Sequence, residues 1–195
     1  KRLVWEYWDE GGQIQWIAQT ASELGDQLQA IRSAARAGAK AVYTHGGIVD
    51  FWYAQGQTDM LTAALETMRE CEVVGGFAGH DMRAHTWIRD NLQPDFQMCC
   101  YYDPSPRGDN PHHVGGHEER WDKERRDEMA AFIPTLPWPA IHYKVFAAGN
   151  RSIEEGWQFL ASQMRPGDTV CIGHFLKDNP DMIAENAATL RGLLT

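Results

Sequence analysis

Two patterns of hydrophobic and polar residues alternate along the chain. Short apolar runs that are typical of β-strands are each followed by a longer stretch with apolar residues at helical spacing. The predicted strands are Ile14–Thr20, Ala41–Gly46, Val73–His80, Asp95–Tyr102, Ala140–Gly149 and Thr169–Phe175. The predicted helices are Lys1–Glu10, Glu23–Ala37, Thr58–Cys71, Met82–Asn91, Trp121–Leu136, Ile153–Met164 and Asp181–Leu194.

Strands that alternate with helices predict a parallel sheet with helices packed outside it. No glycine-rich phosphate loop follows a strand, which disfavours an open doubly wound sheet. We therefore expect a TIM-type (β/α)8 barrel in the α/β class, with about six of its eight strands present and N-terminal strands missing. Residues 1–195 would form a single barrel domain, and residues 103–119 would form a long loop on its catalytic face.

Composition narrows the possible partners and the cellular location. The 195 residues are 43% hydrophobic and carry a formal net charge of -9, so we expect no binding to nucleic acid. No apolar run approaches the roughly 20 residues needed to span a bilayer, so no membrane partner is expected. The four cysteines include no CxxC pair, which favours buried, reduced thiols in a cytoplasmic protein.

Side-chain alternation within the strands predicts an unusually polar interior for the barrel. Neighbouring strand residues point to opposite faces, and we place the apolar set of each strand against the helices. The polar residues then assigned to the barrel interior are Gln15, Gln19, Tyr43, His45, His80, Gln97, Tyr101, His142 and Lys144. Because burying such groups is costly unless they have partners, this pattern indicates a small-molecule site at the strand ends.

Four segments resemble the strand-end motifs of aldo/keto reductases. They are AVYTHGG, DFQMCCYYDP, AIHYKVFAAG and TVCIGHFLKDNPDMIAENAATL, in the order in which that family has them. The chain resembles the family from Ile14 to Leu190, and is most similar to a divergent bacterial branch with the motif HYK-[IV]-x-AAG. The resemblance implies a nicotinamide-dependent oxidoreductase that binds NAD(P) and acts on a carbonyl or hydroxyl substrate, such as a sugar derivative.

The resemblance also assigns roles to individual residues. It makes His45 the catalytic histidine, Gln97 a ligand of the nicotinamide carboxamide and Tyr143 the ring that stacks on the nicotinamide. Glu185 and Asn186 match the residues that contact adenine.

The chain departs from the family at two places. Its first predicted strand ends at Gln19–Thr20, where the family has its catalytic lysine. Met182 occupies the position of the arginine that binds the 2′-phosphate, and a thioether cannot pair with phosphate.

Other chemistries remain open from the residues themselves. An inward Lys144 could form a Schiff base in a non-redox lyase or aldolase. Histidines at strand ends could bind a divalent metal, as could a loop cluster; the residues are His45, His80, His174, His112, His113, His117, Glu118 and Glu119. The segment Gly149, Asn150 and Arg151 precedes a capped helix, where barrels often bind phosphate. A non-catalytic binding module is the last alternative. Our candidate catalytic residues are His45, His80, Tyr101 and Lys144.

Overall fold

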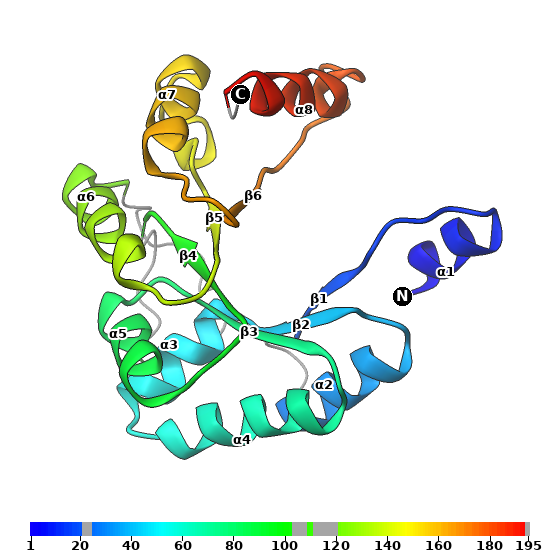
Figure 1. Cartoon of the computed structure of the whole chain (residues 1–195), viewed down its shortest axis with the longest axis vertical. Coiled ribbons are helices and arrows are strands. Elements are labelled where there is room, and N and C mark those ends of the chain that lie inside the picture. The colour runs from blue at the N-terminus through cyan, green and yellow to red at the C-terminus, as the bar shows by residue number, and fades with distance from the viewer. Residues whose placement is uncertain (21–24, 103–108, 111–120, 194–195) are drawn as a thin grey trace.

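A computed structural model describes residues 1–20, 25–102, 109–110 and 121–193. Its centre is a parallel sheet of six strands that follow one another in sequence order. The strands are β1 (Ile17–Gln19), β2 (Ala41–Thr44), β3 (Val74–Gly79), β4 (Phe96–Cys100), β5 (Ala140–Tyr143) and β6 (Thr169–Cys171). The sheet curls, with β1 and β6 at its two edges (Figure 1). This confirms the α/β class and the parallel order, and it is consistent with part of a TIM-like fold.

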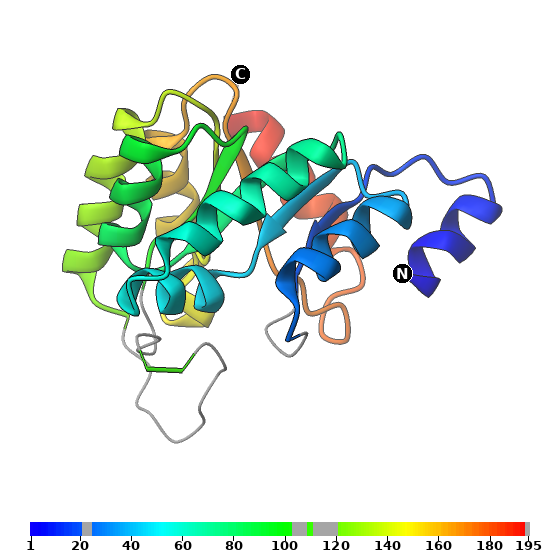
Figure 2. The same ribbon diagram turned by 90° about the horizontal axis from the view of Figure 1, so that it is seen from below.

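Helices connect the strands and lie mainly on the convex side of the sheet (Figure 1 and Figure 2). The α-helices are α1 (Arg2–Asp9), α2 (Gln27–Arg36), α3 (Gly46–Ala54), α4 (Thr58–Glu70), α5 (Met82–Asn91), α6 (Lys123–Phe132), α7 (Ile153–Gln163) and α8 (Met182–Leu193). Two short 3-10 helices, η1 (Ile133–Thr135) and η2 (Ala147–Gly149), follow α6 and β5. Each predicted helix has a counterpart here.

Helix α3 was not predicted, because its first residues are two glycines. The helix begins where it does because the imidazole of His45 caps it, accepting a hydrogen bond at Nδ1 from the backbone N–H of Gly47 at 3.1 Å. The apolar side chains of α3 then pack into the core beneath β3. Local capping and tertiary burial together outweigh the low helix propensity of the glycines.

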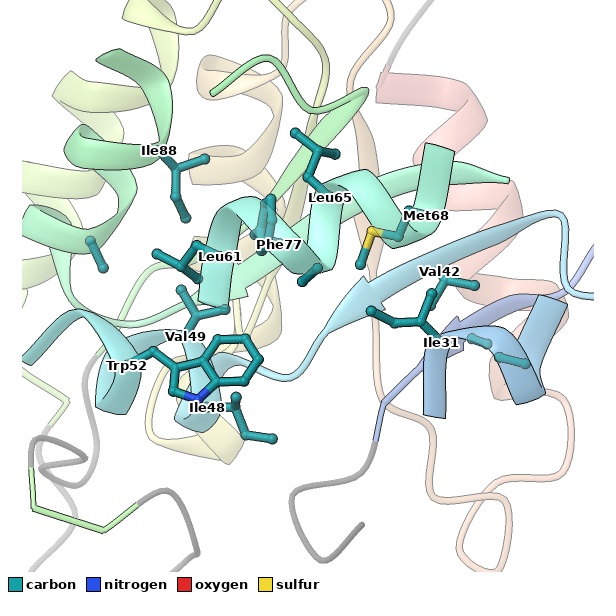
Figure 3. Packing of buried hydrophobic residues seen from close by; sticks show 14 of the residues in the cluster. Ile31, Val42, Ile48, Val49, Trp52, Leu61, Leu65, Met68, Phe77 and Ile88 are labelled. Carbon is teal, nitrogen blue, oxygen red and sulfur yellow. The ribbon is translucent and has the colours of Figure 1, made fainter. Parts of the chain in front are cut away.

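One hydrophobic cluster joins the convex face of β1, β2 and β3 to helices α2, α3, α4 and α5 (Figure 3). Val42 and Phe77 are fully buried on this face and meet side chains of α2 and α4. Gly75 favours this close approach, because a Cβ there would lie 3.0 Å from the Cβ and Sδ atoms of Met68, which would have to shift. A second cluster, formed largely by Tyr101, Met129 and Leu160, covers β4 and β5 with α6 and α7.

The concave face of the sheet is apolar, contrary to the predicted polar interior. Tyr43 packs edge-to-face on Phe96 with ring centroids 6.3 Å apart. Ile17, Met98 and Ile141 line a cavity of about 480 Å³ between this face and α8. The part of the chain that the structure describes contains no helix that is both long and apolar enough to cross a membrane.

The predicted faces of β4 and β5 were therefore wrong. Gln97, Tyr101 and His142 are completely buried and point toward the helices rather than into the concave side. The prediction of these faces assumes that only apolar side chains face the helix layer. The assumption is wrong here, because the helices and loops supply hydrogen-bond partners for these polar groups.

Candidate functional site at the ends of strands β3, β4 and β5

A buried ion pair between Asp50 and His80 forms the base of the candidate site. Asp50 lies on α3 and His80 directly follows β3; their side chains are 5% and 7% exposed. Nδ1 of His80 lies 2.8 Å from Oδ2 of Asp50. The carboxylate also accepts hydrogen bonds from the backbone N–H groups of His80 and Asp81. These contacts fix the ring and direct its Nε2 atom away from Asp50.

Strand register brings two more side chains beside His80. Gly79 pairs with Cys99 across β3 and β4, and Cys100 pairs with Tyr143 across β4 and β5. His80, Cys100 and Tyr143 therefore form a row across the carboxyl ends of three strands. The Cys100 thiol donates to the carbonyl oxygen of Tyr102 at 2.8 Å and interacts electrostatically with both His80 and Tyr143.

Two side chains that can form hydrogen bonds lie close to Nε2 of His80. The hydroxyl of Tyr143 and the Nζ atom of Lys144 each lie 3.4 Å from it. The Tyr143 hydroxyl also donates to the carbonyl oxygen of Gly79 at 3.3 Å. We call Asp50, His80, Tyr143 and Lys144 the His80 cluster.

A left-handed backbone at Lys144 turns its side chain toward the cluster. The φ angles of Lys144, Ala147 and Ala148 are 58°, 48° and 52°, a region that residues other than glycine rarely occupy. Strand β5 therefore ends at Tyr143, well before the predicted end at Gly149. Strained backbone of this kind often occurs at functional sites, where it fixes a side chain in place.

The environment of the cluster changes the protonation of its members. Burial alone would lower the pKa of His80, but its electrostatic interaction with Cys100 and its hydrogen bond and ion pair with Asp50 outweigh this effect and raise it to about 9. Burial, reinforced by electrostatic interactions with Cys100 and Asp50, raises the pKa of Tyr143 well above 10. At neutral pH the cluster therefore holds a histidine cation and a neutral tyrosine hydroxyl.

A cavity of about 380 Å³ opens beside Tyr143 and Lys144. Its walls come from the turn after β5, from the end of β6 and from Trp121. The ammonium group of Lys144 lies 5.9 Å from the centroid of the Trp121 indole ring. This volume suits a small organic molecule.

Four predicted site residues lie in this region: His45, His80, Tyr143 and Lys144. Tyr143 and Lys144 contact His80 directly. His45 lies at the same end of the sheet, because a Cβ on the adjacent Gly46 would be 3.0 Å from Cε1 of His80. The backbone N–H of His45 donates to the hydroxyl of Thr20 at 3.2 Å.

Tyr101 lies on the other face of the sheet. Its hydroxyl donates to Nδ1 of His142 at 2.6 Å, and Nε2 of His142 contacts Asp168 at 3.2 Å. Arg165 and the backbone N–H of Ala140 complete the surroundings of that carboxylate. The network joins β4, β5 and the loop before β6, which is a structural role.

Gln97 is buried in the helix layer. Its amide nitrogen donates to Nδ1 of His85 at 2.9 Å, and its amide oxygen accepts from the indole N–H of Trp138 at 3.0 Å. Burial lowers the pKa of His85, so that ring stays neutral and can accept the hydrogen bond. Both the nitrogen and the oxygen of the Gln97 amide therefore have hydrogen-bond partners within the protein.

The remaining predicted binding residues are dispersed. Gly149 lines the cavity beside Lys144, whereas the amide of Asn150 donates to the carbonyl oxygen of Ala147 at 2.8 Å. Arg151 donates to the carbonyl oxygen of Trp121 at 3.2 Å. On α8, Glu185 accepts from Asn179 at 2.8 Å, and Asn186 lines the larger apolar cavity on the concave face.

The residues that the structure describes contain no candidate site for a metal ion. Across residues 1–20, 25–102, 109–110 and 121–193, no three His, Cys, Asp or Glu side chains are grouped so that they could hold a metal ion. Most of the predicted loop 103–119 lies outside the described residues, as does its whole cluster of histidines and glutamates.

Two members of the site, Asp50 and Cys100, are not among the site residues predicted from the sequence. Asp50 is the one acidic residue in the apolar stretch GGIVDFWYA, and a buried carboxylate in such a helix requires a partner. That isolated charge was a usable signal. Cys100 had no comparable signal, because its role depends on strand register.

Comparison with known proteins does not assign this site. No protein-family model, no curated protein and no solved structure matches the chain. Its function must therefore be argued from the geometry.

Proposed function

We propose that the protein is a small-molecule enzyme that activates a carbonyl group by hydrogen bonding and proton donation from His80, in a non-redox reaction of the lyase or isomerase type. One observation carries this proposal. Asp50 holds one nitrogen of the His80 ring, while the other nitrogen lies 3.4 Å from both Tyr143 and Lys144, near a cavity at the strand ends.

His80 is suited to be the general acid. A histidine with a pKa of about 9 is cationic at neutral pH and can donate a proton from Nε2 to a substrate oxygen. The Asp50 carboxylate stabilises that cation and prevents the ring from rotating. Positioned proton transfer of this type typically accelerates reactions by about 10²–10⁴-fold.

Tyr143 and Lys144 would bind the same oxygen. The raised pKa of Tyr143 keeps its hydroxyl protonated, so Tyr143 acts as a hydrogen-bond donor rather than as the acid. When a neighbouring C–H bond breaks, its proton passes to solvent water and its electron pair moves toward the carbonyl oxygen, where the developing negative charge meets these donors. Such preorganised donors are often the largest single contribution to catalysis.

One of the residues that the resemblance assigns to a nicotinamide, Gln97, has its hydrogen-bonding groups engaged elsewhere. Gln97 is completely buried, and both its amide nitrogen and its amide oxygen are bonded within the helix layer. We therefore derive no hydride-transfer step. Binding of NAD(P) stays a prediction that calorimetric titration with NAD(H) and NADP(H) tests directly.

A second candidate function is Schiff-base chemistry at Lys144. It is favoured by the position of the Lys144 amine on the cavity wall, 3.4 Å from a histidine that can exchange protons with it. A neutral amine would add to the carbonyl carbon, and His80 would protonate the departing hydroxyl as water. Borohydride trapping of a carbonyl compound on Lys144, and loss of activity in Lys144→Met, would support this route.

We also propose that the six strands belong to a closed (β/α)8 barrel. Their sequential parallel order and the curl of the sheet support this proposal. In a protein that carries the two further strands, closure predicts slow hydrogen exchange at the backbone amides of β1 and β6, because they would be paired on both sides. Fast exchange at both edges would contradict closure.

The proposed chemistry can be tested by isotope exchange. We expect the protein to promote deuterium exchange at the carbon next to the carbonyl of a small ketone or keto acid, followed by proton NMR over a panel that includes dihydroxyacetone and phenylpyruvate. His80→Gln should abolish this exchange, because it removes the acid.

Arg36→Gln is the control, because Arg36 is an exposed cation in the last turn of α2 and belongs to neither the cluster nor the cavity. Circular dichroism would establish that both variants are folded. Exchange that persists in folded His80→Gln, or a folded wild type that promotes no exchange across the panel, would contradict the proposal.

A further inference from the structure

We infer that the cavity beside Lys144 binds an apolar carboxylic acid, with the carboxylate against Lys144 and an aromatic or branched body against Trp121, Phe146 and Ile172. This inference rests on the proposed function, because it names the class of substrate that would reach the His80 cluster. It concerns binding, however, and can be tested without turnover.

The charge of the cavity wall favours one negative group. Among the described residues that line it, Lys144 carries the one formal charge. Asp50 does not oppose an anion there, because its carboxylate is 5% exposed and turned toward His80 and two backbone N–H groups. In a protein of net charge -9, the cluster is thus a local site for an anion.

The rest of the cavity wall is apolar, and its aromatic rings pack against other aromatic rings of the protein. The Trp121 ring packs edge-to-face on Tyr102 at 5.4 Å, and the Phe146 ring packs edge-to-face on Trp157 at 5.2 Å. Phe146 also lies tightly over Gly156, where a Cβ would be 2.3 Å from the ring. A rigid aromatic wall favours a flat or branched hydrocarbon group.

The same surroundings disfavour phosphate esters and sugars. The helix α7, whose N-terminus follows the cavity turn, already has Glu154 and Glu155 in its first turn. Arg151 is directed to the carbonyl oxygen of Trp121. A polyhydroxylated ligand would leave many hydroxyls without partners along this wall, which costs free energy for each one.

The test is calorimetric titration of the whole chain with three probes: 3-phenylpropionate, 3-phenylpropionamide and acetate. We expect 3-phenylpropionate to bind at least about tenfold more tightly than either of the others, because only it has both the charge and the apolar body. Lys144→Met should remove that preference over the amide. Lys40→Met, an exposed lysine just before β2 at the opposite end of the sheet, should leave it unchanged.

A second variant tests the wall independently of the charge. Gly156→Ala should push the Phe146 ring toward the cavity and weaken binding of 3-phenylpropionate. Equal affinity for the acid and its amide in the wild type, or unchanged binding of the acid in folded Lys144→Met, would overturn the inference. Binding as expected without any deuterium exchange would instead contradict the proposed function alone.

Discussion

Replacing Asp50 with Asn tests the central interaction of the site. The change keeps the size of the side chain but removes the charge that faces Nδ1 of His80 at 2.8 Å. The difference between the usual pKa of 6.5 and the value of about 9 corresponds to about 3 kcal/mol in favour of the cation. His80 is 7% exposed, so solvent screens this interaction little.

Two effects of Asp50→Asn follow from this magnitude. The pKa of His80 should fall by about one to three, since an opposite charge at this distance has an effect of that size. The wild type gains stability from His80 that is complete below pH 6.5 and is lost as the pH rises through about 9. The Asn variant should show less of this alkaline loss.

The first effect is measured by NMR titration of the histidine rings, with His80 assigned by comparison with His80→Gln. The second is measured by urea unfolding at about pH 6 and about pH 10. Asp59→Asn, which changes an exposed carboxylate at the start of α4, is the control. The reasoning is refuted if the His80 ring titrates near 6.5 in the wild type, or at the same pH in wild type and Asp50→Asn.

Two further predictions concern stability. Although burial opposes it, hydrogen bonds from Arg165 and the backbone N–H of Ala140 lower the pKa of Asp168 to about 2. Wild-type stability should therefore decline as the pH falls from 3.8 toward 2, and Asp168→Asn should show a smaller decline in urea titrations. Phe77→Ala should reduce the free energy of unfolding by about 3–5 kcal/mol, since Phe77 is fully buried. Val74→Ala, at a position 48% exposed on the same strand, should have a much smaller effect.

The order of the fold could be predicted because it depends on periodicity along the chain. Strand-like runs and helical stretches alternate clearly, and parallel pairing follows from that alternation. The end of β5 could not be predicted in the same way. Residues 140–149 read as one continuous strand-like run, and the left-handed backbone at Lys144 breaks it.

Side-chain direction was predicted less well than the order of elements. The faces of Gln97 and His142 were misassigned because their partners, His85 and Asp168, come from segments distant in sequence. His80 and Lys144 were predicted from polar side chains at strand ends, and Tyr143 from the family resemblance; the structure places Tyr143 and Lys144 beside His80. Asp50 was not predicted because it lies on α3, and the two glycines that begin α3 disfavour the prediction of a helix from sequence.

The row formed by His80, Cys100 and Tyr143 has a consequence for folding kinetics. Each neighbouring pair of strands in this sheet is joined through helical segments rather than a hairpin, so the row forms only after long loops have closed. Strand β4 lies in the middle of the row and must dock before His80 and Tyr143 can meet across it. A refolding intermediate in which β4 has not docked would show much of the helical circular dichroism signal but would not bind the ligand. Ligand binding should therefore recover last.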